Sequence, residues 1–298
     1  MDNNLDTENL KNEGVYNYYM DLKIPAPKST RIIAVANQKG GVGKTTTVVN
    51  FAAVYALKGF HVLVIDFDPQ CNATTAFNIE KTPETATIYD VIKGNVDPES
   101  AIQTDQYLPT LDIIPSSPLL ANADVELLNT IGREYILKEK IEAITEYRDS
   151  RGEPAYDYII IDCGPTLGLL VVNSLVAANE VLIPIQAQYY ALEGVTHIAQ
   201  TISQIQKNLN PDLSLSGILI TMYQGGTNLS RDVVDQVKQV YPEILIKTLI
   251  PQNVRIAEAP SHNLSVMQFA GKSTGALTYL EAALRYVYMA PNGNIKKL

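Results

Sequence analysis

Cysteine is scarce in this 298-residue sequence, which contains only Cys71 and Cys163. Two thiols cannot form a disulfide framework or supply a four-cysteine metal site, and Cys163 directly behind an apolar run is typical of a small buried side chain. No apolar run approaches the ~20 residues that a membrane-spanning helix needs, and the first residues lack the pattern of a signal peptide. We therefore expect a cytoplasmic protein whose core needs neither disulfides nor a metal for stability.

Positive charge is also in short supply, with 23 Lys and Arg against 32 Asp and Glu and a net charge of −9. This balance argues against the generally basic surface by which many proteins hold nucleic acid. From Thr201 to Leu298, however, nine Lys and Arg oppose six Asp and Glu, a local excess of +3. Two interpretations of that third stay open: a face that meets a polyanion in an oligomer, or ordinary solvated lysines, which are more frequent.

Apolar runs alternate with helix-like stretches after residue 30, and the runs are continuous in Val, Ile and Leu, as in strands buried on both faces. A helix is predicted over 194–210, and strands are predicted at 31–36, 61–66, 111–114, 158–162, 180–185, 216–221 and 244–250. The alternation predicts an α/β fold with a doubly wound, mainly parallel sheet in a single domain over residues 31–298. The polar residues 1–30 are expected to form an N-terminal extension or arm, partly helical through 15–22.

Residues 37–47, Asn-Gln-Lys-Gly-Gly-Val-Gly-Lys-Thr-Thr-Thr, lie between an apolar run and a helix-like stretch. They fit the end of the P-loop pattern G-x-x-x-x-G-K-[ST], although Gln38 occupies the first glycine position. Glycines let successive N–H groups point at phosphate oxygens, and the helix N-terminus adds partial positive charge. We therefore predict a nucleotide site of the P-loop NTPase kind, in which Lys44 contacts the β- and γ-phosphates and Thr45 offers its hydroxyl to Mg²⁺. The remaining cradle residues are Gly40, Gly41, Val42, Gly43 and Thr46.

Aspartates close two further apolar runs, where Asp66 and Asp68 follow the second predicted strand and Asp162 ends the fourth. Ligands of open α/β sheets bind beyond the carboxyl ends of the strands, so these acids should converge on the glycine loop. Asp162 is expected to be the Mg²⁺ partner, held directly or through water. Asp68 is assigned to the attacking water and Asp66 to the outer shell of the metal, although these two roles are open to exchange.

A second lysine, Lys39, stands at the outer lip of the same loop, and no separate arginine finger is apparent. At that position it can reach the nucleotide of another molecule, so a face-to-face dimer would let each subunit neutralise charge in the transition state of the other. The alternative is an exposed loop lysine with no role.

These segments resemble the deviant Walker-A ATPases of the ParA/MinD group, and within it the ParA partition ATPases of plasmids and chromosomes. The resemblance rests on residues 38–46, 66–70, 189–194, 251–255 and 258–262. It implies a DNA segregation ATPase with ATP and Mg²⁺ as cofactors, and a homodimer formed on ATP binding in which Lys39 crosses to the partner. It also implies ATP-dependent binding to nonspecific double-stranded DNA of the nucleoid, and hydrolysis that is weak alone and stimulated by a centromere-binding, ParB-like partner.

The resemblance further implies that Met222, Pro251 and Asn253 lie near the adenine and that Arg255 faces DNA. Short ParA relatives often have an arginine where this chain has Gly226 and another where it has Gln252, so two expected cations are absent. Each lost phosphate contact weakens DNA binding. Compensating cations would be Lys247, Lys272, Lys207 and Lys296-Lys297. Because ~30 residues precede the cradle, no N-terminal helix-turn-helix domain is expected by this resemblance.

Two related functions compete with this interpretation, and a non-catalytic nucleotide-gated adaptor is a third alternative, since the role of Asp68 is an inference. A MinD-like membrane-associated spatial regulator would need an amphipathic membrane helix, and 275–289 carries the apolar stripe Leu277, Leu280, Leu284 and Val287. Such stripes usually pack on the core instead. A nitrogenase-like iron–sulfur reductase would need paired cysteines that bridge a dimer, and the two cysteines present lie outside that pattern.

Overall fold

The computed structural model describes residues 3–188 and 191–289, with side chains described from residue 12 onward. The segments Tyr189-Tyr190 and Lys296-Lys297, which the sequence analysis singled out, lie outside the described residues.

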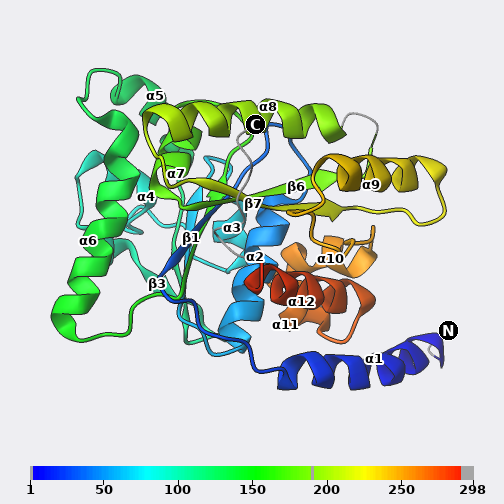
Figure 1. Ribbon diagram of the computed structural model, residues 1–298. Helices are drawn as coiled ribbons and strands as arrows, with labels where there is room; N and C mark the ends of the chain where they lie inside the picture. The colour runs from blue at the N-terminus through cyan, green and yellow to red at the C-terminus, as the bar shows by residue number, and fades with distance from the viewer. Residues whose placement is uncertain (1–2, 189–190, 290–298) are drawn as a thin grey trace.

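A seven-stranded sheet forms the centre of the molecule, in the order β3-β4-β2-β5-β1-β6-β7 (Figure 1). Every pairing is parallel except that of β3 with β4, and the strand residues are mostly buried, as continuous apolar runs predict. Six of the predicted strands and the doubly wound α/β fold are confirmed, whereas the short strand β3 was not predicted. The strands are β1 (Arg31–Val35), β2 (Val62–Phe67), β3 (Gln103–Thr104), β4 (Leu111–Ile114), β5 (Tyr158–Cys163), β6 (Glu180–Gln186) and β7 (Ser214–Thr221).

The strand predicted at 244–250 is wrong. This segment touches β7 at an isolated bridge between Ile218 and Leu245, and Ile246 N donates to Ile218 O at 2.9 Å. Contact with β7 resumes only at Ile250, whose N–H donates to Ile220 O at 2.9 Å. Between Ile246 and Ile250 the chain does not continue the hydrogen bonding to β7. An apolar run of strand-like composition therefore forms an irregular edge of the sheet instead of a strand.

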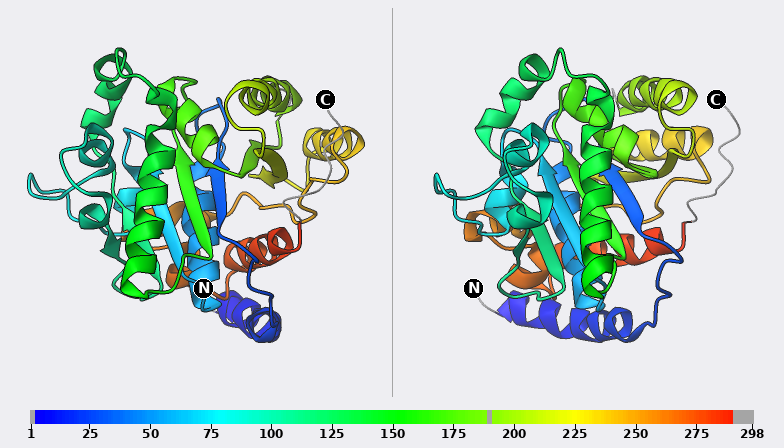
Figure 2. Two further views of the ribbon diagram at one scale, coloured as in Figure 1. Left: turned by 60° about the vertical axis from the view of Figure 1, so that its left-hand side comes forward. Right: turned by 90° about the vertical axis from the view of Figure 1, so that its left-hand side faces the viewer.

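Helices cover both faces of the sheet (Figures 1 and 2). One apolar cluster joins one face to α4, α6, α7 and α8, and a second joins the other face to α2, α3, α11 and α12. The predicted helix 194–210 is confirmed as α8. The helices are α1 (Asn3–Asp21), α2 (Lys44–Leu57), α3 (Asn72–Ala76), α4 (Ile88–Lys93), α5 (Ala123–Glu126), α6 (Ile136–Arg151), α7 (Leu169–Ala177), α8 (Ala191–Asn208), α9 (Asn228–Val240), α10 (Val254–Glu258), α11 (Val266–Ala270) and α12 (Thr274–Val287), with 3-10 turns η1 (Pro98–Ala101), η2 (Pro118–Asn122), η3 (Arg133–Tyr135) and η4 (Ala259–His262).

The apolar stripe of α12 faces the core. Leu277, Leu280 and Leu284 are buried in the same cluster as Phe51 of α2. The stripe therefore packs within the protein and is not free to enter a bilayer, as the core alternative predicted. Within residues 3–188 and 191–289, no helix combines the length and apolar character needed to cross a membrane.

Helix α1 is longer than the predicted helix over 15–22 and lies beside α12 (Figure 2). Its Tyr16, Tyr19 and Met20 pack partly buried against the cluster of α2 and α12. The Lys58 ammonium, just beyond α2, donates to the carbonyls of Tyr19 at 3.2 Å and Met20 at 2.7 Å, so it caps the end of α1. The extension thus makes specific contacts with the rest of the protein, and the domain boundary at residue 30 stays a prediction.

Candidate nucleotide site

The glycine loop turns from the end of β1 into the first residue of α2, and its conformation requires glycine. Gly41 and Gly43 have φ values of +71° and +88°, a region that side chains with a Cβ rarely adopt. A Cβ on Gly43 would lie 3.6 Å from Cγ2 of Thr221, an ordinary contact, so the backbone conformation and not a lack of space requires glycine there. Gly43 is therefore the residue at which the loop can turn tightly beneath the end of β7.

Two side chains that the sequence analysis missed fasten this loop to neighbouring strands. Thr221 Oγ1, at the end of β7, donates to Val42 O at 2.8 Å. Asn37 Nδ2 donates to Pro184 O of β6 at 2.8 Å, and Asn37 Oδ1 accepts from Lys39 N at 3.0 Å. The buried Val42 therefore anchors the loop, while the glycines around it face the site.

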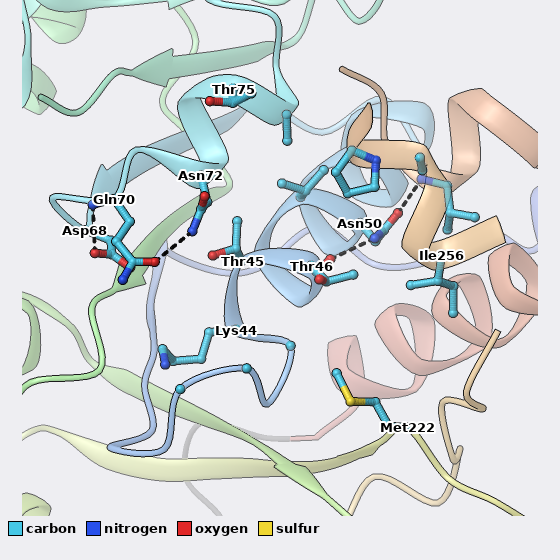
Figure 3. A pocket seen from close by; sticks show the side chains of 18 of the residues that line it. Lys44, Thr45, Thr46, Asn50, Asp68, Gln70, Asn72, Thr75, Met222 and Ile256 are labelled. Atoms are coloured by element: carbon cyan, nitrogen blue, oxygen red, sulfur yellow. Dashed lines mark hydrogen bonds between the residues drawn. The ribbon is translucent and has the colours of Figure 1, made fainter. Parts of the chain in front are cut away.

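A cavity of about 460 Å³ opens above the loop (Figure 3). Lys44 and Asp68 lie at one end of it, and Met222 and Ile256 lie at the other. The structure thus brings together eight of the predicted site residues: Gly40, Gly41, Gly43, Lys44, Thr45, Thr46, Asp68 and Met222. The lining residues that the sequence analysis missed include Asn50, Gln70, Asn72, Pro165, Ile256 and Pro260.

Lys44 projects into this cavity while remaining almost fully buried, with 7 % of its surface exposed. Its ammonium donates to Lys39 O at 3.2 Å, which holds the side chain under the loop. Burial lowers the pKa of Lys44, and the carboxylates of Asp162 and Asp68 oppose that shift. The arrangement supplies a positive charge with few competing partners where phosphate oxygens would lie.

Asp162, the last but one residue of β5, is completely buried and near Thr45 and Lys44. Within the described residues, neither oxygen of its carboxylate has a donor at full hydrogen-bonding distance and angle, although the Thr45 hydroxyl is close enough to affect its pKa. Burial raises the pKa of Asp162 well above its ordinary value, Asp66 raises it further, and the Thr45 hydroxyl and Lys44 lower it. A buried carboxylate without partners is costly unless a cation compensates it. The Asp162 and Thr45 oxygens are hard donors of the kind that Mg²⁺ prefers, so this site fits that ion.

Asp66 accepts hydrogen bonds from the protein on both of its carboxylate oxygens. Its Oδ2 accepts from both Thr74 N at 2.7 Å and Thr74 Oγ1 at 2.6 Å, and its Oδ1 accepts from Asp68 N at 3.3 Å. Burial raises the pKa of Asp66 to about 6, against the effect of the Thr74 hydrogen bonds. The carboxylate is buried and accepts hydrogen bonds from protein donors, and its place in the outer shell of a metal stays a prediction.

Asp68 lines the cavity, as expected for a group that orients water. Its Oδ1 accepts from Gln70 N at 3.0 Å, and its backbone carbonyl accepts from Ser116 Oγ at 2.8 Å. Gly164 lies close by, since a Cβ at that position would be 3.4 Å from Asp68 Oδ1. The loops that follow β2 and β5 therefore meet at Asp68.

The predicted adenine contacts are only partly brought to the cavity. Met222 lines it, whereas Asn253 Oδ1 accepts from Arg255 N at 2.9 Å and Ile256 N at 3.4 Å and so caps α10. Pro251 precedes this cap, outside the lining residues. Ile256, one turn further along, occupies the cavity wall. Helix capping therefore turns Ile256, rather than Asn253, toward the cavity, and the adenine contacts stay a prediction.

The predicted DNA-binding cations and Lys39 all lie at the surface. Arg255 Nη1 is 3.1 Å from Glu258 Oε2, and Lys272 Nζ is 2.6 Å from Glu13 Oε1 of α1. Lys247 is exposed on the irregular edge beside β7. Two of the three predicted cations are therefore already paired with carboxylates of this chain.

Proteins of known sequence and structure are similar to this chain over most of its length. A family model described as an AAA domain matches residues 30–215. The sporulation initiation inhibitor protein Soj of Bacillus subtilis (strain 168) is 45% identical, covering 85% of this chain and 96% of its own. The chromosome partitioning protein ParA of Caulobacter vibrioides (strain NA1000 / CB15N) is 40% identical, covering 85% and 92%. The crystal structure of cobyrinic acid a,c-diamide synthase from Mycobacterium smegmatis with bound ATP analog and magnesium is 36% identical with a TM-score of 0.72, covering 86% and 93%.

Proposed function

Because this chain belongs to the ParA/Soj family of chromosome-partitioning ATPases, we propose that it binds and hydrolyses ATP to drive the segregation of DNA. The observation that carries the proposal is the buried Asp162 carboxylate, which lacks a partner in the described structure and lies beside Lys44 and Thr45. The Mg²⁺ of a bound magnesium nucleotide would supply the positive charge that compensates this carboxylate. A relative of 36% identity was solved with an ATP analog and magnesium, which supports the same ligands here.

In this proposal the backbone N–H groups of the glycine loop hold the phosphates, and Lys44 contacts the β- and γ-phosphates. Thr45 and Asp162 hold Mg²⁺, directly or through water. The bound ion supplies neutralisation of charge on the phosphate oxygens. Met222 and Ile256 contact the base at the other end of the cavity.

Asp68 orients the attacking water, since phosphoryl transfer depends mainly on positioning and charge neutralisation. ATP binding joins two chains face to face, and Lys39 of each chain reaches the phosphates held by the other. Each site is then complete only in the dimer, because it takes one of its cations from the other chain. A centromere-binding, ParB-like partner stimulates the reaction.

Arg255 and Lys247 contact the phosphates of nonspecific duplex DNA, with Lys272 joining them when its ion pair opens. Phosphate contacts carry no sequence information, so the protein would bind along the nucleoid without a preferred site. ATP-dependent dimerisation doubles the number of such contacts, and hydrolysis reverses it.

The deciding experiment is retention of the purified protein on nonspecific duplex DNA with ATP, with ADP and without nucleotide, at two salt concentrations. We expect retention with ATP only, and weaker retention at the higher salt concentration. Lys44→Ala is the matched control, because it removes the main phosphate contact and should abolish both ATP binding and retention. Equal retention in all three nucleotide conditions would overturn the proposed cycle.

A further inference from the structure

The chain that follows β4 touches the loop that carries Asp68 and the start of the helix that comes after Asp162 and its following loop. Ser116 contacts the loop after β2, which contains Asp68, and Asp124 contacts the start of α7, which follows the loop after Asp162. Neither residue lines the cavity. Both belong to one short segment, residues 116–124, which we call the β4–α5 segment.

Ser116 completes a closed ring of buried hydrogen bonds. Its Oγ donates to Asp68 O at 2.8 Å, and its N–H donates to Thr74 Oγ1 at 2.8 Å. Thr74 Oγ1 in turn donates to Asp66 Oδ2 at 2.6 Å, and Asp68 N donates to Asp66 Oδ1 at 3.3 Å. The four residues are at most 5 % exposed. The ring therefore holds Asp68 from its N–H and from its carbonyl, on groups shielded from competing water.

Asp124 holds the second loop from the other end of the segment. Its Oδ1 accepts from Leu169 N, the first residue of α7, at 3.0 Å. A carboxylate is stabilised at this end of a helix. A Cβ on Gly168 would lie 2.5 Å from Asp124 Oδ2, so the absence of a side chain there permits the close approach. The residues between Asp162 and α7 include Pro165 of the cavity wall, so this contact sets one boundary of the site.

We propose that the β4–α5 segment holds the loops that follow β2 and β5 in register for hydrolysis, with Ser116 and Asp124 as positioning residues that act through Asp68 and through the 163–168 loop. The inference rests on the proposed ATPase function. Nucleotide affinity depends mainly on the glycine loop, with which the hydrogen bonds of Ser116 and Asp124 described above make no link. Loss of either contact should therefore slow turnover while ATP binding persists.

Ser116→Ala tests the first contact, with Ser117→Ala as the matched control. Ser117 Oγ accepts from Leu119 N at 3.2 Å and caps η2, so the control removes a neighbouring hydroxyl that does not reach Asp68. We expect kcat of Ser116→Ala to fall about tenfold, because small misplacements of a positioned group are costly, with an unchanged Kd for a fluorescent ATP analog. Ser117→Ala should keep the wild-type kcat.

Asp124→Ala tests the second contact at an exposed residue, and its melting temperature is measured alongside its activity. Glu126→Ala is its control. This substitution removes the same charge from α5, but the Glu126 carboxylate pairs with Lys93 at 2.8 Å on the surface. We again expect a lower kcat with unchanged ATP affinity for Asp124→Ala, and wild-type values for Glu126→Ala.

Single-turnover hydrolysis of MgATP by the wild-type protein distinguishes a failure of the proposed ATPase function from a failure of the proposed positioning role. No hydrolysis by the wild type would contradict the proposed ATPase function itself. Hydrolysis by the wild type that both Ser116→Ala and Asp124→Ala retain in full would overturn the positioning role alone. Equal losses of kcat, ATP affinity and melting temperature in both variants would also overturn it, since they indicate a general structural defect.

Discussion

The ammonium of Lys39 donates a hydrogen bond of 2.8 Å to Oε1 of Gln188, an exposed residue just beyond β6. The lysine proposed to act in the second subunit therefore rests on its own chain. Dimer formation must break this contact before Lys39 can reach another nucleotide. Gln188 thus competes with the partner phosphates for the same ammonium.

Gln188→Ala should favour the ATP-dependent dimer. An exposed hydrogen bond contributes little net free energy, so we expect the dimer dissociation constant to fall by about threefold. Sedimentation velocity with a slowly hydrolysed ATP analog measures the change, and Gln204→Ala on the exposed side of α8 is the control. An unchanged dissociation constant would show that the Lys39 contact does not oppose assembly.

Asp68→Ala should separate binding from hydrolysis. The variant keeps Lys44, Thr45 and the glycine loop, so it should bind MgATP and dimerise like the wild type. Loss of the group that orients water should reduce turnover by about 100-fold or more. Phosphate release and equilibrium ATP binding are measured together, with Asp232→Ala on exposed α9 as control. Wild-type hydrolysis by the variant would move the role to another residue.

Much of this site could be predicted because its chemistry is local in the sequence. The glycine loop and the aspartates at strand ends are contiguous motifs, and buried parallel strands bring their carboxyl ends to one edge. Asp162 was placed beside Lys44 by that rule alone. Six strands were likewise predicted from apolar runs, because a strand covered on both faces has apolar side chains at nearly every position.

The contacts that hold the site in shape could not be predicted in the same way. Thr221 reaches Val42, and Ser116 reaches Asp68, only because of the order in which the strands pair. An isolated Ser or Thr in the sequence does not reveal its partner. The strand prediction for 244–250 was wrong for a related reason. Apolar composition does not show whether a segment stays hydrogen-bonded to the neighbouring edge strand.

Glu13→Gln should strengthen DNA binding if the Lys272 ion pair masks a phosphate contact. The pair lies at the surface, with side chains 46 % and 44 % exposed, so it opens at little cost. We expect tighter retention with ATP and a salt slope steeper by about 0.9 for each Lys272 released. Fluorescence anisotropy with labelled duplex DNA across salt concentrations measures both. Glu139→Gln on α6 makes the same charge change away from α1, and an equal effect there would indicate net charge alone.

The two cysteines should be unreactive in the folded protein. Both are buried; burial raises the pKa of Cys71 and raises that of Cys163 to about 12. Since the thiolate is the reactive form, we expect slow reaction with a disulfide reagent at about pH 8, and rapid release of both thiols after unfolding in urea. Cys71→Ser assigns any residual signal. Fast labelling of the native protein would contradict the burial of these residues.

Glu180→Gln should destabilise the fold without affecting nucleotide binding. Glu180 and Arg31 begin β6 and β1, at the strand ends opposite the nucleotide site, and form a buried bidentate pair with both N–O distances at 2.6 Å. Tyr286 OH of α12 also donates to Glu180 Oε2 at 3.0 Å. Removing the charge of Glu180 leaves the guanidinium of Arg31 buried and uncompensated, which costs about 3–5 kcal/mol.

Urea denaturation measures this loss, and ATP affinity measured in parallel should stay at the wild-type value. Glu281→Gln is the matched control, because Glu281 pairs with Arg285 at 2.7 Å on the exposed side of α12, where a pair contributes about 1 kcal/mol at most. A loss for Glu180→Gln as small as that of the control would mean that the carbonyls of Tyr286 and Val287, at 3.4 and 3.3 Å from Arg31 Nη1, suffice to hold the guanidinium. The pair would then be a contact that orders α12 on the sheet while adding little to its stability.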